Sequence, residues 1–221
     1  MKRFINIIAI LLILTFSMSL YSCDREYDEK EVLAAAKVLI EKSYKLNELF
    51  YGKGLEYTDD ENSVGVYKLA TQDSLNEYGI STVEDMKNMA REIFSDSYCN
   101  VIFNSDIFTS TKVNNELTSY ARYYQQYDKD GNASGIMVRS TYDYRLVGTY
   151  TYHEQMQVVD VIEQVIVVRA LVTAQDLDGN TKNVNVDISM IEESDGWKLT
   201  TSTYVVYNGY SDLYDDLINN K

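Results

Sequence analysis

Residues 157–174 read QVVDVIEQVIVVRALVTA, and this run decides the fold. So many β-branched residues in one stretch are typical of β-strands. From about residue 119 to residue 206, apolar residues recur with a period of two, as they do on one face of a half-buried strand. Polar turn sequences interrupt this region at residues 128–132, 176–180 and 194–196. The C-terminal part of the chain therefore predicts a meander of antiparallel strands.

A long amphipathic helix is predicted over residues 29–51. Its core-facing positions alternate three and four residues apart, which is the spacing of one helix face: Val32, Ala36, Leu39, Ser43, Leu46 and Phe50. Acidic residues at its start favour the helix dipole, and Gly52 and Gly54 end it. We expect this helix to cover one face of the predicted sheet.

Shorter elements are predicted between this helix and the strands. Residues 56–79 read as a loop with one short strand at residues 64–69. Ser81 and Glu84 have the spacing of a capping box, which predicts the start of a second helix. A break at residues 94–96 starts a third, short helix, which is expected to contain Tyr98, Val101, Ile102 and Phe103.

Helices followed by antiparallel strands predict an α+β fold, with N-terminal helices packed on a C-terminal antiparallel β-meander. The order of elements over residues 29–206, ending in Gly196-Trp197-Lys198-Leu199, resembles the cystatin-like and nuclear-transport-factor-like superfamilies. This resemblance implies a helix lying on a curved sheet. We expect a single domain over residues 31–221, ending in a short helix at residues 211–219, because the sequence contains no repeat and no second set of core elements.

The N-terminus has the organisation of an export signal: a short basic stretch precedes an apolar run too short to span a bilayer. Leu20-Tyr21-Ser22-Cys23 resembles the bacterial lipobox. The resemblance implies that residues 1–22 are removed as a signal peptide and that Cys23 is lipidated, with residues 23–30 containing a short tether. More than one acyl chain gives stable anchoring. We therefore expect an extracytoplasmic protein held on the bacterial cell membrane, the alternative being a secretory peptide cut elsewhere.

The chain is acidic, with 20 Lys and Arg against 34 Asp and Glu and a net charge of −14. Loss of residues 1–22 would remove Lys2 and Arg3 and leave −16. Such a surface repels phosphate groups, so nucleic-acid binding is disfavoured. The 20 tyrosines fit either strand packing or a platform for sugars or peptides.

The sequence offers no evident catalytic constellation. His153 is the only histidine, and Cys99 is the only cysteine besides Cys23. Cys99 lies in an apolar helical stretch, so we expect a buried thiol, and we expect His153 in a loop that connects strands. One His and one Cys fall short of the ligands of a zinc site unless carboxylates supply the rest. We predict no catalytic residue, no metal and no cofactor.

Two turns and one tryptophan have alternative interpretations. Residues 128–132 and 176–180 both read Asp-x-Asp-Gly-Asn, but neither EF-hand register has the closing Glu, so they are interpreted as hairpin turns with weak calcium binding as the alternative. Trp197 follows a glycine at a strand start and is expected to anchor the core, the alternative being a ligand platform. Among the many carboxylates no glycosidase-like pair stands out.

Residues 49–54, 91–95 and 120–124 resemble segments of uncharacterised clostridial lipoproteins, some of which are similar to IseA-like inhibitors of cell-wall DL-endopeptidases. Such inhibitors use a protruding loop. The resemblance implies a non-enzymatic module that binds a cell-envelope partner, such as a cell-wall hydrolase. The alternative is a small-molecule-binding or hydrolytic α+β cone. Converging carboxylates in a deep pocket between the helix at residues 29–51 and the sheet would favour that alternative, whereas a filled core with a protruding acidic loop would favour the inhibitor.

Overall fold

The predicted long helix is present in the computed structural model as α2, Glu29–Tyr51. Asp28 is its N-cap, and its side chain accepts a hydrogen bond from the N–H of Lys30 at 2.9 Å. Acidic residues in the first turn interact favourably with the helix dipole. The helix ends at Gly52. The bounds predicted from the apolar spacing are therefore confirmed.

The structure describes residues 27–59, 63–113, 116–142, 149–175 and 181–203. Helices lie mostly in the N-terminal part and antiparallel strands in the C-terminal part, which confirms the α+β class. The turn at residues 176–180 and the helix predicted at residues 211–219 lie outside the described residues. After α2 the elements are β1 (Tyr67–Leu69), α3 (Gln72–Tyr78), α4 (Val83–Ile93), α5 (Asp96–Phe103), β2 (Thr111–Val113), β3 (Glu116–Ser119), β4 (Tyr123–Tyr127), β5 (Ala133–Arg139), β6 (Thr149–Ile162), β7 (Val165–Gln175), β8 (Thr181–Glu193) and β9 (Gly196–Leu199).

The strands form two principal sheets, so the prediction of one continuous meander is wrong. β6, β7, β8 and β9 pair in chain order in an antiparallel sheet, as a meander requires. β4 and β5 form the predicted hairpin, but the other side of β5 pairs with β1, with Tyr67 opposite Arg139. The short strands β2 and β3 pair with each other. The hairpin around residues 128–132 therefore belongs to a second sheet, with strand order β1-β5-β4.

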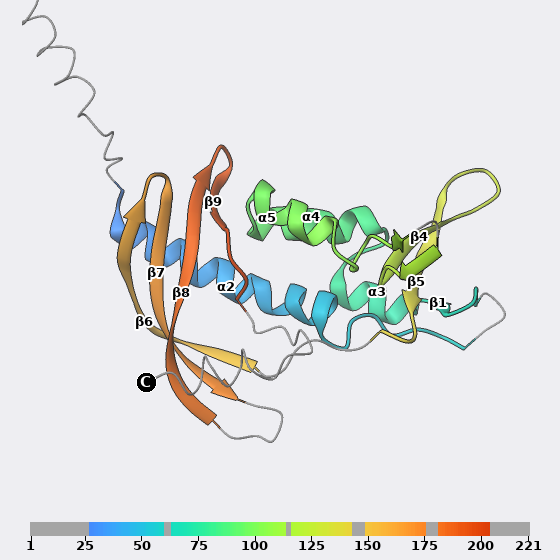
Figure 1. Ribbon diagram of the computed structural model, residues 1–221, viewed down its shortest axis with the longest axis horizontal. Helices are drawn as coiled ribbons and strands as arrows, with labels where there is room; N and C mark the ends of the chain where they lie inside the picture. The colour runs from blue at the N-terminus through green and yellow to red at the C-terminus, as the bar shows by residue number, and fades with distance from the viewer. Residues whose placement is uncertain (1–26, 60–62, 114–115, 143–148, 176–180, 204–221) are drawn as a thin grey trace, which may run out of the picture.

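Helix α2 runs past both sheets (Figure 1). Inward residues of β7, such as Ile166 and Val168, are at most 3% exposed and share one core cluster with the buried face of α2. Strands β6 and β9 contact the helix directly. The three-stranded sheet lies towards its other end, where the Tyr123 hydroxyl donates a hydrogen bond to the Leu49 carbonyl at 2.7 Å. α2 thus holds the two sheets at different positions along its length.

Helix α4 begins one residue later than the predicted capping box. The Thr82 side chain accepts a hydrogen bond from the N–H of Asp85 at 3.1 Å, and Asp85 Oδ2 accepts from the N–H groups of Ser81 and Thr82, each at 2.8 Å. Asp85, and not Glu84, closes the box because its carboxylate reaches both N–H groups. The third predicted helix, α5, does follow the expected break and is capped by Ser95.

One further expectation for this region is wrong. Residues 56–79 were expected to contain no helix, but α3 forms there, with Thr71 accepting a hydrogen bond from the N–H of Ser74 at 3.2 Å. The helix has seven residues and buries Leu75 as its apolar contact, so it leaves little periodic signal. Val101 lies in α5, as predicted, and is 65% exposed.

Candidate functional site

The β4–β5 hairpin projects from the three-stranded sheet (Figure 1), and its loop is closed by one carboxylate. Asp128 Oδ1 accepts hydrogen bonds from the N–H of Asp130 at 2.8 Å and of Asn132 at 2.9 Å, and Oδ2 accepts from the Asn132 side-chain amide at 3.2 Å. The main-chain N–H and then the side-chain amide of Asn132 lower the pKa of Asp128. Gly131 supplies the positive φ of +83° that the loop needs. This carboxylate holds its own loop and so has a structural role.

Tyrosines cover the sheet beside this hairpin. Tyr67 of β1 meets Tyr124 of β4 edge to face, with ring centroids 4.6 Å apart, and Tyr120 lies 6.3 Å from Tyr67. The Tyr67 hydroxyl is held by the carbonyl of Ala121 at 2.8 Å. At the end of β4, Tyr127 is 63% exposed. An exposed ring on an ordered strand offers contact area at low entropic cost, which is the property of binding surfaces.

A groove runs between β4 and the start of α4, with a volume of about 380 Å³. The N–H of Val83 donates to Gln125 Oε1 at 2.9 Å and joins its two walls. The Lys87 ammonium lies 5.4 Å from the centre of the Phe108 ring. Tyr127 also lines this groove, so that the projecting hairpin and the groove form one continuous candidate surface.

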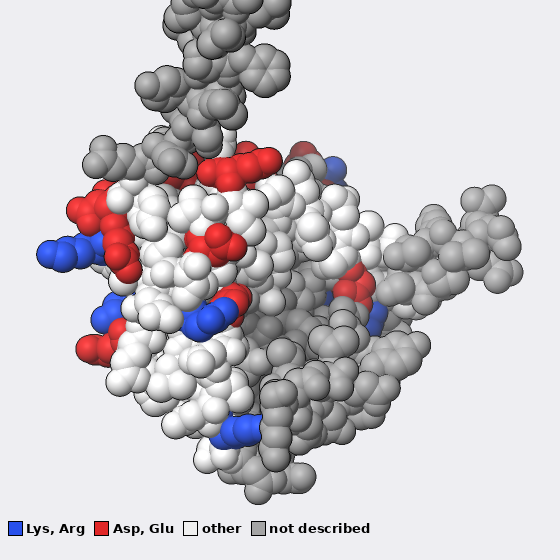
Figure 2. Space-filling view, turned by 60° about the vertical axis from the view of Figure 1, so that its left-hand side comes forward, with Lys and Arg blue, Asp and Glu red and all other residues white. Residues whose placement is uncertain are grey.

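A second hollow lies where α2 begins, with a volume of about 150 Å³. The Trp197 indole N–H donates to Glu31 Oε1 at 3.4 Å, so the predicted core anchor is half buried and also forms part of a pocket wall. Figure 2 shows acidic side chains on the face around the start of α2. The hollow is lined by Tyr27, Asp28, Glu31, Val161, Glu163, Gln164, Ile166, Glu192 and Trp197.

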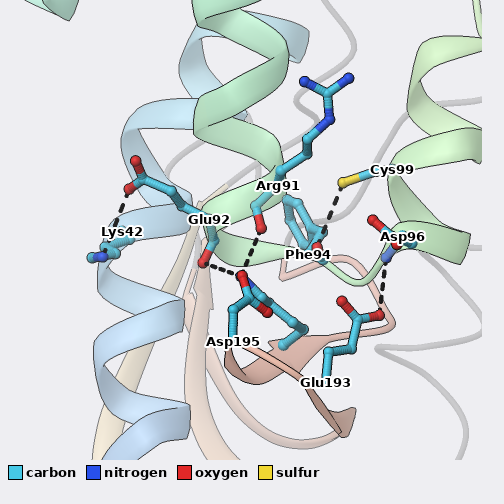
Figure 3. Close-up of polar contacts among 9 residues, drawn as sticks. Lys42, Arg91, Glu92, Phe94, Asp96, Cys99, Glu193 and Asp195 are labelled. Atoms are coloured by element: carbon cyan, nitrogen blue, oxygen red, sulfur yellow. Dashed lines mark hydrogen bonds and ion pairs between the residues drawn. The ribbon is translucent and has the colours of Figure 1, made fainter.

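Cys99 and His153 are held in separate local networks. The Cys99 thiol points to the carbonyl of Phe94 at 3.5 Å (Figure 3), and burial raises the pKa of Cys99 to about 11. His153 lies within strand β6, so its predicted position in a connecting loop is wrong, and its Nε2 is 2.8 Å from the Thr173 hydroxyl. This arrangement disfavours an activated thiolate, because activation requires a lowered thiol pKa.

Two buried cations stabilise helix ends. Arg122, which directly precedes β4, donates from Nη2 to the carbonyl of Gly52 at 2.7 Å, and it is 1% exposed. Lys198 of β9 donates to the carbonyl of Arg91 in the last turn of α4 at 2.8 Å and pairs with Asp195 at 2.9 Å. Figure 3 shows the α4 end together with the contact between Lys42 and Glu92. These cations interact favourably with carbonyl groups at helix C-termini and are structural.

Other sites predicted from sequence are only partly covered by the structure. Cys23 lies outside the described residues. Within the described ranges, no group of three or more His, Cys, Asp and Glu side chains is arranged to hold a metal ion. The helices in those ranges include none with the length and apolar content needed to cross a membrane.

The chain was compared with family models, with curated proteins and with solved structures. None of the three comparisons found a match.

Sequence reasoning missed both the groove and the buried arginine. The segment 120–124 was noted for its resemblance, and the signal within it is Arg122, a cation between aromatic residues in a strand start. Its guanidinium lies 4.3 Å from the Tyr142 ring centre. The groove depends on how β4 and α4 approach each other, and no local pattern encodes that approach.

Proposed function

We propose that this protein is a lipid-anchored extracytoplasmic lipoprotein of bacteria that binds another cell-envelope protein and performs no catalysis itself. The observation that carries the proposal is the projecting β4–β5 hairpin, closed by Asp128 and ending in the exposed ring of Tyr127. A projecting acidic loop is the arrangement expected of an inhibitor-like module, whereas the carboxylate-lined hollow between the start of α2 and the sheet is the feature that favours the alternative. The resemblance to IseA-like inhibitors makes a cell-wall hydrolase the first partner to test.

The position of the hairpin relative to the proposed tether supports this function. Residues 23–30 lead directly into α2, whereas the hairpin sheet lies towards the other end of that helix. At 1.5 Å per residue, the 23 residues of α2 measure about 34 Å. A lipid on Cys23 would therefore leave the hairpin directed away from the anchored end of the domain.

Charge supports a protein partner with a basic surface. The chain carries −14, and the projecting loop contains Asp128 and Asp130. Complementary charge increases the rate of encounter and selects among partners more than it increases affinity. The affinity is expected to come from the aromatic side chains, in particular Tyr127.

The anchor is tested by metabolic labelling with radioactive palmitate. Wild-type protein should carry label and sediment with membranes, and Cys23→Ser should lose the label and be released. Equal membrane association of Cys23→Ser, or an unlabelled wild type, would contradict the lipid anchor.

The binding surface is tested by photo-crosslinking in cells that express the full chain. A benzoylphenylalanine in place of Tyr127 should form one discrete crosslink to an envelope protein. The same group in place of Val101 should not, although these side chains are similarly exposed at 63% and 65%. If the crosslinked protein is a hydrolase, adding the purified wild-type protein should lower that hydrolase's activity. The Tyr127→Ala variant should inhibit the same hydrolase less strongly. Identical crosslinks from both positions would count against the hairpin.

A second candidate function is favoured by the hollow at the start of α2. Its lining combines the ring of Trp197 with the carboxylates of Glu31 and Glu192, which is suited to a small organic cation. Because Trp197 is the only tryptophan, its fluorescence reports on this hollow alone. Titration with tetramethylammonium or spermidine should quench it, and Glu31→Gln should weaken the effect. Unchanged fluorescence would remove this candidate.

A further inference from the structure

Strand β4 is an edge strand, because the order of its sheet is β1-β5-β4. The N–H of Tyr123 donates to the carbonyl of Ile107 at 3.0 Å, so it is directed away from β5. Alternation along an antiparallel strand places the N–H and C=O of Gln125 on that same outer side. Within the described part of the chain, no residue forms a hydrogen bond to these two groups. The outer edge of β4 is therefore hydrogen-bonded at Tyr123, whereas the outward backbone groups of Gln125 have no partner in the described part of the chain.

The unpaired part of this edge borders the groove against α4. Gln125 lines the groove together with Phe108 and Tyr127. The groove has a volume of about 380 Å³, which lies within the roughly 300–1,000 Å³ of pockets that enclose small ligands. An extended peptide in this position would pair with the backbone of β4 and place alternate side chains against the aromatic wall.

The other long edge of the protein is blocked against such pairing. On β6, the N–H of Tyr152 donates to the Tyr44 hydroxyl at 3.3 Å, and the N–H of Val161 donates to Asp160 Oδ1 at 2.8 Å. Register shifts also interrupt β6 between Tyr152 and Met156. Bulges and capped N–H groups are how proteins protect edge strands from association. Of these two edges in the described part of the chain, the β4 edge is therefore the more accessible to an added strand.

We propose that an extended segment of the partner adds as a fourth strand to the edge of β4, in the groove between β4 and α4, with a Lys or Arg side chain meeting the hairpin loop. This inference rests on the proposed function, because it names how the same hairpin surface holds its partner. Asp128 and Asp130 supply negative charge at that end, and Lys129 between them offsets one of the two charges, so that the loop at residues 128–132 carries −1. A second copy of this chain is a poor occupant, since each copy carries −14.

The test uses the full chain in detergent and, as probe, a positional-scanning library of short peptides in which Lys is fixed at one position at a time. The best-binding peptide is then methylated at each amide nitrogen in turn. Strand addition predicts that methylation of alternate amides weakens binding about tenfold, the effect of one lost main-chain hydrogen bond, and that methylation of the others does not.

The matched variants are Gln125→Pro and Gln125→Ala. Both lose the side-chain contact to Val83, but only Gln125→Pro also loses the outward N–H, a change that edge strands accept. Gln125→Pro should bind the peptide about tenfold more weakly than Gln125→Ala, with both variants folded by circular dichroism. Absence of any peptide binding, equal affinities or methylation effects without alternation would overturn strand addition. If the crosslink from position 127 still forms when strand addition has been rejected, the hairpin remains the binding surface and only the mode of binding is wrong.

Discussion

Arg122 and Gly52 join the second sheet to the end of the long helix. The guanidinium Nη2 donates to the Gly52 carbonyl at 2.7 Å, although α2 has no basic residue in its own last turn. The residue directly before β4 thus supplies the cation that the helix C-terminus favours. The Nε and Nη1 atoms of Arg122 have no hydrogen-bond partner among the described residues, so the position of this charge is maintained by one bond and by the Tyr142 ring.

Arg122→Leu is expected to lower the free energy of unfolding by roughly 2–3 kcal/mol, because it removes a charge-assisted hydrogen bond and leaves a buried carbonyl unpaired. Arg122→Lys keeps the charge but loses the planar contact with Tyr142, so it should cost about half as much. Urea unfolding of both variants measures the difference. A more stable Arg122→Leu would mean that burial of the two unpaired nitrogen atoms outweighs these contacts.

Thr203 attaches the chain after β9 to the buried face of α2. Ser43 donates to the carbonyl of Ile40, so the Thr203 hydroxyl donates to Ser43 Oγ at 2.6 Å and accepts from Asn47 Nδ2 at 2.9 Å. Thr203→Val keeps the shape but leaves a buried amide donor unpaired, which should cost about 2 kcal/mol. Thermal unfolding at fixed concentration measures it, with Thr203→Ser as the control that keeps the hydroxyl. Equal stability of Thr203→Val and wild type would contradict this network.

Asp128→Ala should open the hairpin loop without unfolding the protein. Hydrogen exchange at the amides of Asp130 and Asn132 should increase, while the free energy of unfolding changes little, because the site is exposed. Asp128→Asn retains an acceptor oxygen and should fall in between. Unchanged exchange in Asp128→Ala would show that the turn closes without this carboxylate.

The same carboxylate predicts how the loop responds to acid. The pKa of Asp128 is lowered by hydrogen bonds from Asn132, so its contribution is present above the ordinary value of 3.8 and is lost as the pH falls through the lower folded value. The protection of the Asn132 amide, which is the intrinsic exchange rate divided by the observed rate at the same pH, should therefore decrease only below pH 3.8. If the hairpin loop opened well above that pH, the Asp128 carboxylate would not be the group that holds it closed.

Tyr123 predicts a loss of stability in alkali. Burial raises its pKa from 10.0 to about 12. Because the folded protein holds this proton more tightly than the unfolded chain does, the stabilisation is complete below pH 10 and is lost as the pH rises towards 12. Urea unfolding across this interval should show a steeper decline for wild type than for Tyr123→Phe, which has no proton to lose there. Equal slopes would contradict the prediction.

The long helix could be predicted to the residue because its stripe runs through six turns and ends at a glycine. The division into two sheets could not, because β5 shows the same alternation whether its second neighbour is β1 or β6. β1 has only three residues, too few for a periodic signal. Tertiary packing decides which strand pairs with β5, and the alternation of apolar residues along β5 does not identify that strand.

His153 shows a different limit. It was expected in a loop that connects two strands, but β6 continues through residues 153–155 and shifts register between Tyr152 and Met156. A bulge lets a strand accept polar residues without a turn. The candidate surface was only partly predictable for a related reason: the hairpin loop follows from its turn residues, whereas the groove depends on where α4 lies.

Gly54 gives the protein a recognisable fingerprint. Its φ of +71° favours glycine, and a Cβ atom there would collide with the side chains of Arg122 and Tyr123. Any larger residue would displace both of the groups that link β4 to α2. Distant relatives of this fold should therefore preserve a glycine two residues after the first-helix stop together with an Arg-Tyr pair opening the later strand. That coupled signature could trace ancestry in chains whose remaining positions have diverged beyond alignment.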